Sequence, residues 1–172
     1  MKVYTSTTTT APAARAERER TKVGIADFAV ASGDATLTTS GLGSCVGIAL
    51  YDREAGVAGL AHAMLPYADG DATEAKYADT VVPALVRAMV EEGAEPRRMR
   101  AKLAGGSTMF EFSSADGSIG DRNVAAAKEA LSRQGIRVVA EDVGGDHGRS
   151  LELAASTGAF RVRSAHVGET TL

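Results

Sequence analysis

The chain has 172 residues, of which 44% are hydrophobic and 24% are charged, and its formal net charge is −3. This length and composition are typical of one soluble globular domain with a substantial core. The negative net charge and the absence of tryptophan argue against nucleic acid as the main partner.

No apolar run approaches the roughly 20 residues that a membrane-spanning helix needs, and the N-terminus lacks the apolar segment of a secretory signal. Cys45 is the single cysteine, which excludes an internal disulfide and a cysteine-rich zinc site and fits a reducing compartment. We therefore expect a cytoplasmic protein without membrane insertion, metal or cofactor.

The N-terminal segment differs in composition from the rest of the chain. Residues 1–22 are rich in threonine, alanine and charge and show no apolar periodicity. This pattern predicts a disordered tail. Residues 23–172 are expected to form one domain.

The next part of the chain has a β pattern. Strands are expected over residues 23–30 and 35–39. Residues 46–51 and 57–65 are nearly continuously apolar, which indicates two buried strands joined at a turn. This segment is therefore predicted to be a hairpin.

Two helices are expected in the second half, over residues 73–92 and 120–134. Pro83 lies inside the first of them, so that helix should begin late or kink there. Because strands outnumber helices and no regular βαβ repeat occurs, the pattern favours the α+β class. Further strands are expected over residues 99–103, 136–143, 149–153 and 159–162.

Cys45 follows a run of small residues and directly precedes the first hairpin strand. A nucleophilic cysteine needs its thiolate, and a neighbouring imidazole lowers the thiol pKa. If the hairpin is centred near residue 54, residue 46 lies opposite residue 62, and Cys45 stands about one residue beyond His62. A different register would change the face that each side chain occupies. His147 and His166 are weaker candidates.

The turn before the cysteine has a second possible use. Backbone N–H groups at Gly43 and Ser44 are placed to bind the oxyanion of a tetrahedral intermediate. The hydroxyl of Thr39 is a candidate to orient the imidazole. The alternatives are that Cys45 is inert core, that His62 is a core histidine bonded to backbone, and that Thr39 is an ordinary strand residue.

Five segments, in this order, resemble the CheD family of chemoreceptor glutamine deamidases. They include the Cys45 turn, the strand that carries His62, and Gly105-Gly106 with Met109 and Phe110. The segments are residues 39–46 with 49–52, 59–66, 102–106 with 109–110, 119–123, and 142–145 with 148–149.

The resemblance implies a cysteine hydrolase with a Cys–His–Thr triad formed by Cys45, His62 and Thr39. The implied fold is a layered α+β sandwich of mixed and antiparallel β-sheet with two main helices, similar to CNF-type deamidating toxins. The implied reaction deamidates glutamines of methyl-accepting chemoreceptors to glutamate through a thioester during chemotactic adaptation. A CheC-type phosphatase is the second implied partner.

Two other functions remain compatible with the residues. One is a weakly catalytic or non-catalytic adaptor that binds a CheC-type phosphatase and receptors. Met109 and Phe110 would then form an exposed apolar contact, although core packing also explains them. The other is a redox-sensing thiol, which would not need His62.

Overall fold

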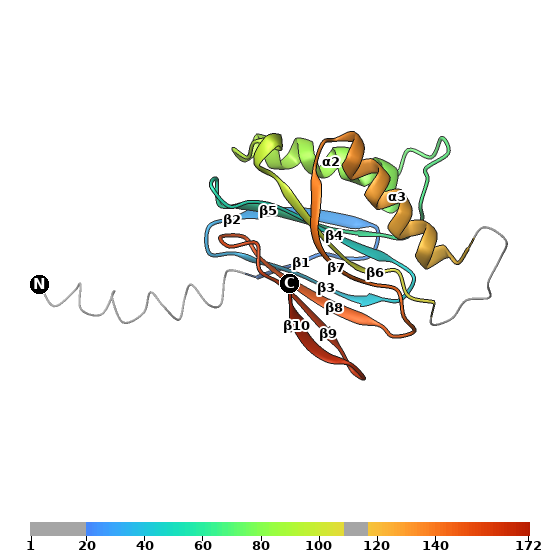
Figure 1. The fold of residues 1–172 in the computed structure, drawn as a ribbon. Helices are drawn as coiled ribbons and strands as arrows, with labels where there is room; N and C mark the ends of the chain where they lie inside the picture. The colour runs from blue at the N-terminus through green and yellow to red at the C-terminus, as the bar shows by residue number, and fades with distance from the viewer. Residues whose placement is uncertain (1–19, 109–116) are drawn as a thin grey trace, which may run out of the picture.

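The chain folds into three stacked layers in a computed structural model that describes residues 20–108 and 117–172. Two helices cover one face of a five-stranded sheet, here called the inner sheet (Figure 1). A second five-stranded sheet, the outer sheet, packs on its other face. The predicted α+β sandwich with two main helices is thus confirmed.

The inner sheet has the strand order β2-β5-β4-β6-β7, and only its β6–β7 pair is parallel. Its strands are β2 (Asp27–Ser32), β4 (Val46–Asp52), β5 (Val57–Ala63), β6 (Arg100–Gly105) and β7 (Arg137–Val143).

The outer sheet has the order β1-β3-β8-β9-β10, with β1 and β3 parallel. Two of its strands correct the sequence expectations. The first lies in the last three residues of the expected tail, and the last follows the final expected strand. The strands are β1 (Arg20–Lys22), β3 (Thr36–Leu42), β8 (Arg149–Ala154), β9 (Phe160–Ser164) and β10 (Gly168–Thr171).

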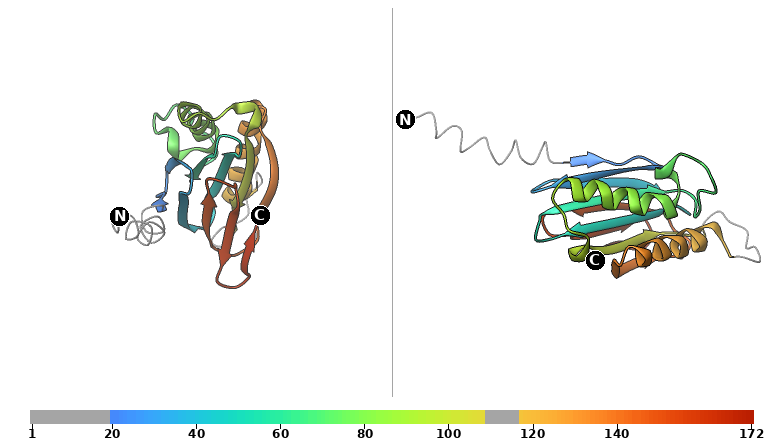
Figure 2. Two further views of the ribbon diagram at one scale, coloured as in Figure 1. Left: turned by 90° about the vertical axis from the view of Figure 1, so that its left-hand side faces the viewer. Right: turned by 90° about the horizontal axis from the view of Figure 1, so that it is seen from above.

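Helices α2 (Ala78–Glu91) and α3 (Ile119–Arg133) lie next to each other on the inner sheet, as the view from above shows (Figure 2). The expected first helix begins late because Tyr77 is extended, with φ −115° and ψ 136°. Pro83 is accommodated inside α2. Two short 3-10 helices, η1 (Glu74–Lys76) and η2 (Pro96–Arg98), precede α2 and β6.

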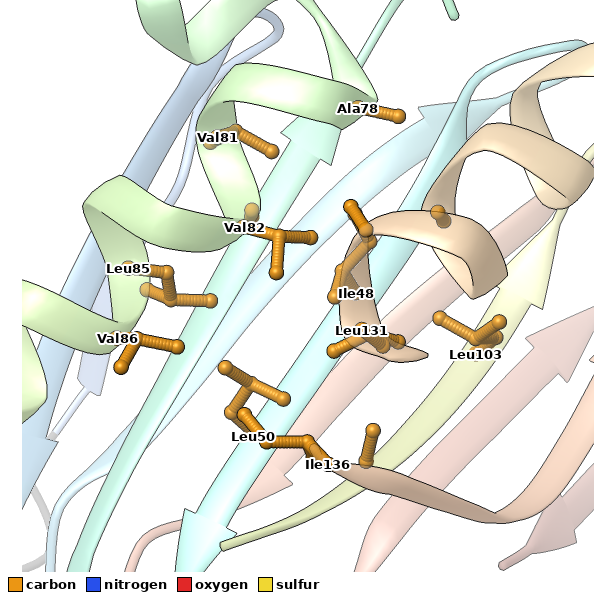
Figure 3. Close-up of a cluster of buried hydrophobic side chains, with 14 of the residues drawn as sticks. Ile48, Leu50, Ala78, Val81, Val82, Leu85, Val86, Leu103, Leu131 and Ile136 are labelled. Atoms are coloured by element: carbon orange, nitrogen blue, oxygen red, sulfur yellow. The ribbon is translucent and has the colours of Figure 1, made fainter. Parts of the chain in front are cut away.

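Strand alternation divides the core into two layers. In β4, Ile48 and Leu50 point toward the helices and meet side chains such as Leu85 and Leu131 (Figure 3). Ala49 and Tyr51 belong instead to the cluster between the two sheets. Because both faces of β4 are covered, its apolar run is continuous rather than alternating.

Candidate active site

The Cys45 turn crosses from one sheet to the other. Strand β3 of the outer sheet ends at Leu42, and β4 of the inner sheet begins at Val46. Just before the turn, the pairing of β3 is irregular between Thr39 and Leu42, and Gly41 in this stretch has a φ of +76°, which favours glycine. The turn lies at the end of the sandwich where β5 ends and α3 begins (Figure 1).

The three carbonyl groups of this turn are all held by hydrogen bonds. The donors are two backbone N–H groups from the end of β6 and one side-chain amide from α3. Ser107 N donates to Gly43 O at 2.8 Å, Asn123 Nδ2 to Ser44 O at 2.8 Å, and Gly106 N to Cys45 O at 2.8 Å.

The hairpin register differs by one residue from the sequence prediction. Val46 pairs with Ala63, and Gly47 rather than residue 46 pairs with His62. The cause is a four-residue connection after Asp52, whose carboxylate accepts bonds from two backbone N–H groups of the turn. The expected centre at residue 54 was therefore half a residue too early.

This shift brings Cys45 and His62 to the same face of the sheet. Residues that pair directly share a face, and side chains alternate along a strand, so the alternation of β4 continued back by one residue puts Cys45 on the face of Gly47 and His62. Cys45 packs against the cluster between the two sheets, as that placement requires. Such diagonal neighbours have Cα atoms roughly 7–8 Å apart. Gly47 itself carries no side chain on this face, and the outer sheet fills the space beside it, since a Cβ there would lie 2.3 Å from Leu151 Cδ1.

Thr39 determines the tautomer of His62. The Thr39 hydroxyl donates to Val23 O at 2.8 Å, and its oxygen lies 2.8 Å from His62 Nδ1. A hydroxyl has one proton to donate, so in the second bond Nδ1–H is the donor and Thr39 the acceptor. The neutral imidazole therefore keeps its lone pair on Nε2.

His62 is fully buried, and burial lowers its pKa to about 4, so the ring is neutral at pH 7. Its Nε2 atom has no hydrogen-bond partner within residues 20–108 and 117–172. An unpaired buried acceptor is costly for a fold to retain. We take it as the atom that is free to accept a proton in a reaction.

Cys45 is half-buried and has a free thiol. Burial raises the pKa of this thiol, opposed by a smaller effect of its own backbone N–H. The resting thiolate that the sequence led us to expect is therefore not favoured. The site at rest combines a neutral thiol with a neutral imidazole.

Gly43 and Ser44 carry the two backbone N–H groups expected at an oxyanion site. In the described parts of the chain these groups donate to no protein acceptor, whereas the carbonyls of the same residues are occupied. Met109 and Phe110, the expected partner contact, lie outside the described residues.

Two buried polar residues next to the turn had no role in the sequence prediction. Asn123 is fully buried and bonds the turn, while Ser107 is fully buried and its hydroxyl has no partner in the described part of the chain. Asn123 could have been singled out from the sequence, because it is the only asparagine in the chain and lies on a helix otherwise rich in alanine.

Neither a metal centre nor a membrane segment is found. Across residues 20–108 and 117–172, no group of three His, Cys, Asp or Glu side chains is placed to hold a metal ion. No helix in those same residues has the length and apolar character needed to span a membrane.

Fold and site together define an α+β sandwich with a half-buried thiol and a threonine-oriented imidazole on one sheet face. The family model described as CheD chemotactic sensory transduction matches residues 64–164, more than half of the chain. The chain belongs to the CheD family. That match begins after Thr39, Cys45 and His62, but alignments with whole relatives extend across these positions.

Curated relatives cover most of the chain. A probable chemoreceptor glutamine deamidase CheD of Haloarcula marismortui is 51% identical over 175 residues and covers 100% of both chains. The chemoreceptor glutamine deamidase CheD of Bacillus subtilis is 45% identical and covers 88% of this chain and 95% of its own. Among solved structures, the hypothetical protein YfiH of Bacillus licheniformis is 18% identical, with a TM-score of 0.46 over 67% of this chain and 49% of its own.

Proposed function

We propose that this protein is a protein-glutamine glutaminase that converts glutamine side chains of chemoreceptors to glutamate, the activity for which its CheD relatives are named. The observation that carries the proposal is the Thr39–His62 hydrogen bond. It leaves Nε2 as an unpaired base on the face of the sheet that Cys45 also occupies.

In the first half of the reaction, Cys45 Sγ attacks the carboxamide carbon of a glutamine. Because burial disfavours the resting thiolate, the thiol proton passes to His62 Nε2 as the S–C bond forms. The N–H groups of Gly43 and Ser44 stabilise the oxyanion of the tetrahedral intermediate. His62 then returns the proton from Nε2 to the departing ammonia, which leaves a thioester.

In the second half of the reaction, a water molecule hydrolyses the thioester. His62 Nε2 takes a proton from the water as the water attacks the thioester carbon. The proton then passes to the leaving Cys45 sulfur, and the side chain is released as glutamate. Throughout the cycle Thr39 accepts the bond from Nδ1–H, which leaves Nε2 as the proton-transferring nitrogen.

The substrate in this proposal is the helical cytoplasmic part of methyl-accepting chemoreceptors, so the protein acts in the cytoplasm. A CheC-type phosphatase is the second proposed partner, in line with the family resemblance. The adaptor function without catalysis is not favoured, because the CheD relatives are named as glutamine deamidases.

The test is mass spectrometry of a receptor cytoplasmic fragment incubated with the wild type or with Cys45→Ala. We expect specific glutamines to gain the mass of carboxamide-to-carboxylate conversion with the wild type and to stay unchanged with the variant. If the wild type binds the receptor but leaves its glutamines unmodified, the glutaminase function is rejected in favour of the adaptor function. A CheC-type phosphatase added to the same assay tests the second partner, which should bind and alter the rate.

A further inference from the structure

Asn123 lies at the start of α3, where that helix packs against the turn region. The hydroxyl of Ser118 accepts a bond from Asp121 N at 3.0 Å and caps the helix. Gly120 allows the helix to approach the end of β6 so closely that a Cβ there would lie 2.5 Å from Gly106 O. This docking places Asn123, one turn further on, in a fully buried position.

The side-chain amide of Asn123 uses both of its donors. Nδ2 donates to Ser44 O at 2.8 Å and to Met64 O at 2.9 Å. The first acceptor belongs to the residue directly before Cys45. The second belongs to the residue two positions after His62. One amide group therefore joins the segments that carry the two reacting side chains.

The β4–β5 ladder explains why this bridge is needed. The last ladder pair is Val46 with Ala63, so Ser44 and Met64 lie beyond the regular hydrogen bonds. The part-buried carbonyl groups of Ser44 and Met64 therefore receive no donor from the ladder, and an acceptor withdrawn from water without a donor destabilises a fold. Asn123 supplies both donors and continues the ladder in the place of a backbone pair.

We propose that Asn123 is a positioning residue that sets the distance and angle between the Cys45 thiol and His62. The inference rests on the proposed deamidase function for its consequence in catalysis. Its structural part, the restraint of the two segments by one amide, is testable without activity. Asn123 contacts no reacting atom in this role.

The first test is the kinetics of Asn123→Asp on a receptor fragment. The new side chain keeps the shape of asparagine but presents acceptors to two carbonyls. We expect kcat to fall on the order of 100-fold, the cost of a displacement of about 1 Å at a reacting group. KM should change little, because receptor docking is not altered.

A pH profile separates positioning from a general loss of structure. Burial beside two carbonyls favours the protonated form of an aspartate, which recovers one donor. The kcat of Asn123→Asp relative to the wild type should therefore rise as the pH is lowered. Leu131→Ala, which opens a cavity under the same helix, is the matched control and should keep its kcat at every pH at which it is folded.

The second test does not depend on the reaction. Amide hydrogen exchange of peptides that contain residues 43–46 and 63–65 should accelerate in Asn123→Asp and not in Leu131→Ala. If Asn123→Asp does not fold, Asn123→Ala takes its place in the kcat and exchange measurements, where it should show the same loss of kcat without a dependence on pH.

Unchanged exchange, a wild-type kcat in the Asn123 variant, or an equal loss of kcat in folded Leu131→Ala would each overturn the proposal. A wild type that leaves receptor glutamines unmodified would count against the deamidase function alone. The exchange comparison would still decide whether Asn123 restrains the two segments.

Discussion

At the scale of single residues, the site depends on which atoms of Thr39, His62 and Cys45 carry a proton. Thr39 gives its only hydroxyl proton to Val23 O, and this makes it an acceptor for His62 Nδ1–H. The imidazole is neutral because it is buried, and its free nitrogen is on the face of Cys45. Proton transfer during attack, rather than a preformed thiolate, follows from these contacts.

Replacing Thr39 tests this arrangement. Thr39→Val keeps the shape but removes the acceptor for Nδ1–H, so the tautomer is no longer set. We expect kcat for receptor deamidation to fall on the order of 100-fold, within the usual range for general acid–base catalysis. Thr39→Ser retains the hydroxyl and should stay within a few-fold of the wild type. Equal activity of Thr39→Val and the wild type would contradict the orienting role.

At the scale of elements, the site forms where a strand of one sheet continues into a strand of the other. The β3–β4 turn carries Cys45, and its three carbonyls are tied to β6 and α3. Strand β5 supplies His62, and β3 supplies Thr39. Movement of α3 against the end of β6 would therefore displace the nucleophile.

Gly120→Ala tests the docking of α3. The new Cβ would lie 2.5 Å from the carbonyl oxygens of both Gly106 and Ser107, and backbone cannot move aside as a flexible side chain can. We expect the free energy of unfolding in urea to fall by about 1–3 kcal/mol, as for other overpacked sites. Gly24→Ala, where nothing lies within 4 Å of the added Cβ, is the control and should change stability by less than about 0.5 kcal/mol. Equal stability of the two variants would show that the helix adjusts freely.

At the scale of the whole molecule, the site occupies the interface between two packed sheets. His62 and Thr39 are buried between layers, while Cys45, in the turn between β3 and β4, is half-buried. The thiol can therefore meet a side chain from another protein, while the base is shielded from bulk water in the resting protein. The same shielding couples the protonation of His62 to folding.

Acid should destabilise the fold through His62. Its pKa falls from 6.5 to about 4 on folding, so between these values the unfolded chain binds more protons. The stability contribution is complete above pH 6.5 and is lost as the pH falls toward 4. The loss amounts to about 3 kcal/mol. Burial opposes the shift at Asp52, but its contacts with Arg98 and backbone N–H groups lower its pKa overall, so protonation of this carboxylate destabilises the fold only near and below its ordinary pKa of 3.8.

Urea denaturation at several pH values measures this effect. The slope of stability between pH 6.5 and 4 should be much smaller in His62→Gln, whatever its absolute stability. Titration of the His62 ring by NMR checks the pKa directly. A ring that titrates near pH 6.5 in the folded protein would refute the explanation.

Much of this arrangement could be predicted from the amino-acid pattern. Continuous apolar runs in β4 and β5 indicated strands buried on both faces, and the hairpin put His62 near Cys45. The register was wrong by one residue because it depends on how Asp52 and Gly56 form the connecting turn. The tautomer of His62 depends on Val23, a contact between segments that no local pattern describes.

The sequence by itself determined the α+β class, the hairpin and the family, because periodicity and motifs are local properties of the chain. Only the tertiary structure decided which face His62 occupies, which of its nitrogens is free, and that Asn123 joins the two reactive segments. These depend on side chains that meet across layers from distant positions. Strand register, burial and the direction of hydrogen bonds depend on packing and not on spacing along the chain.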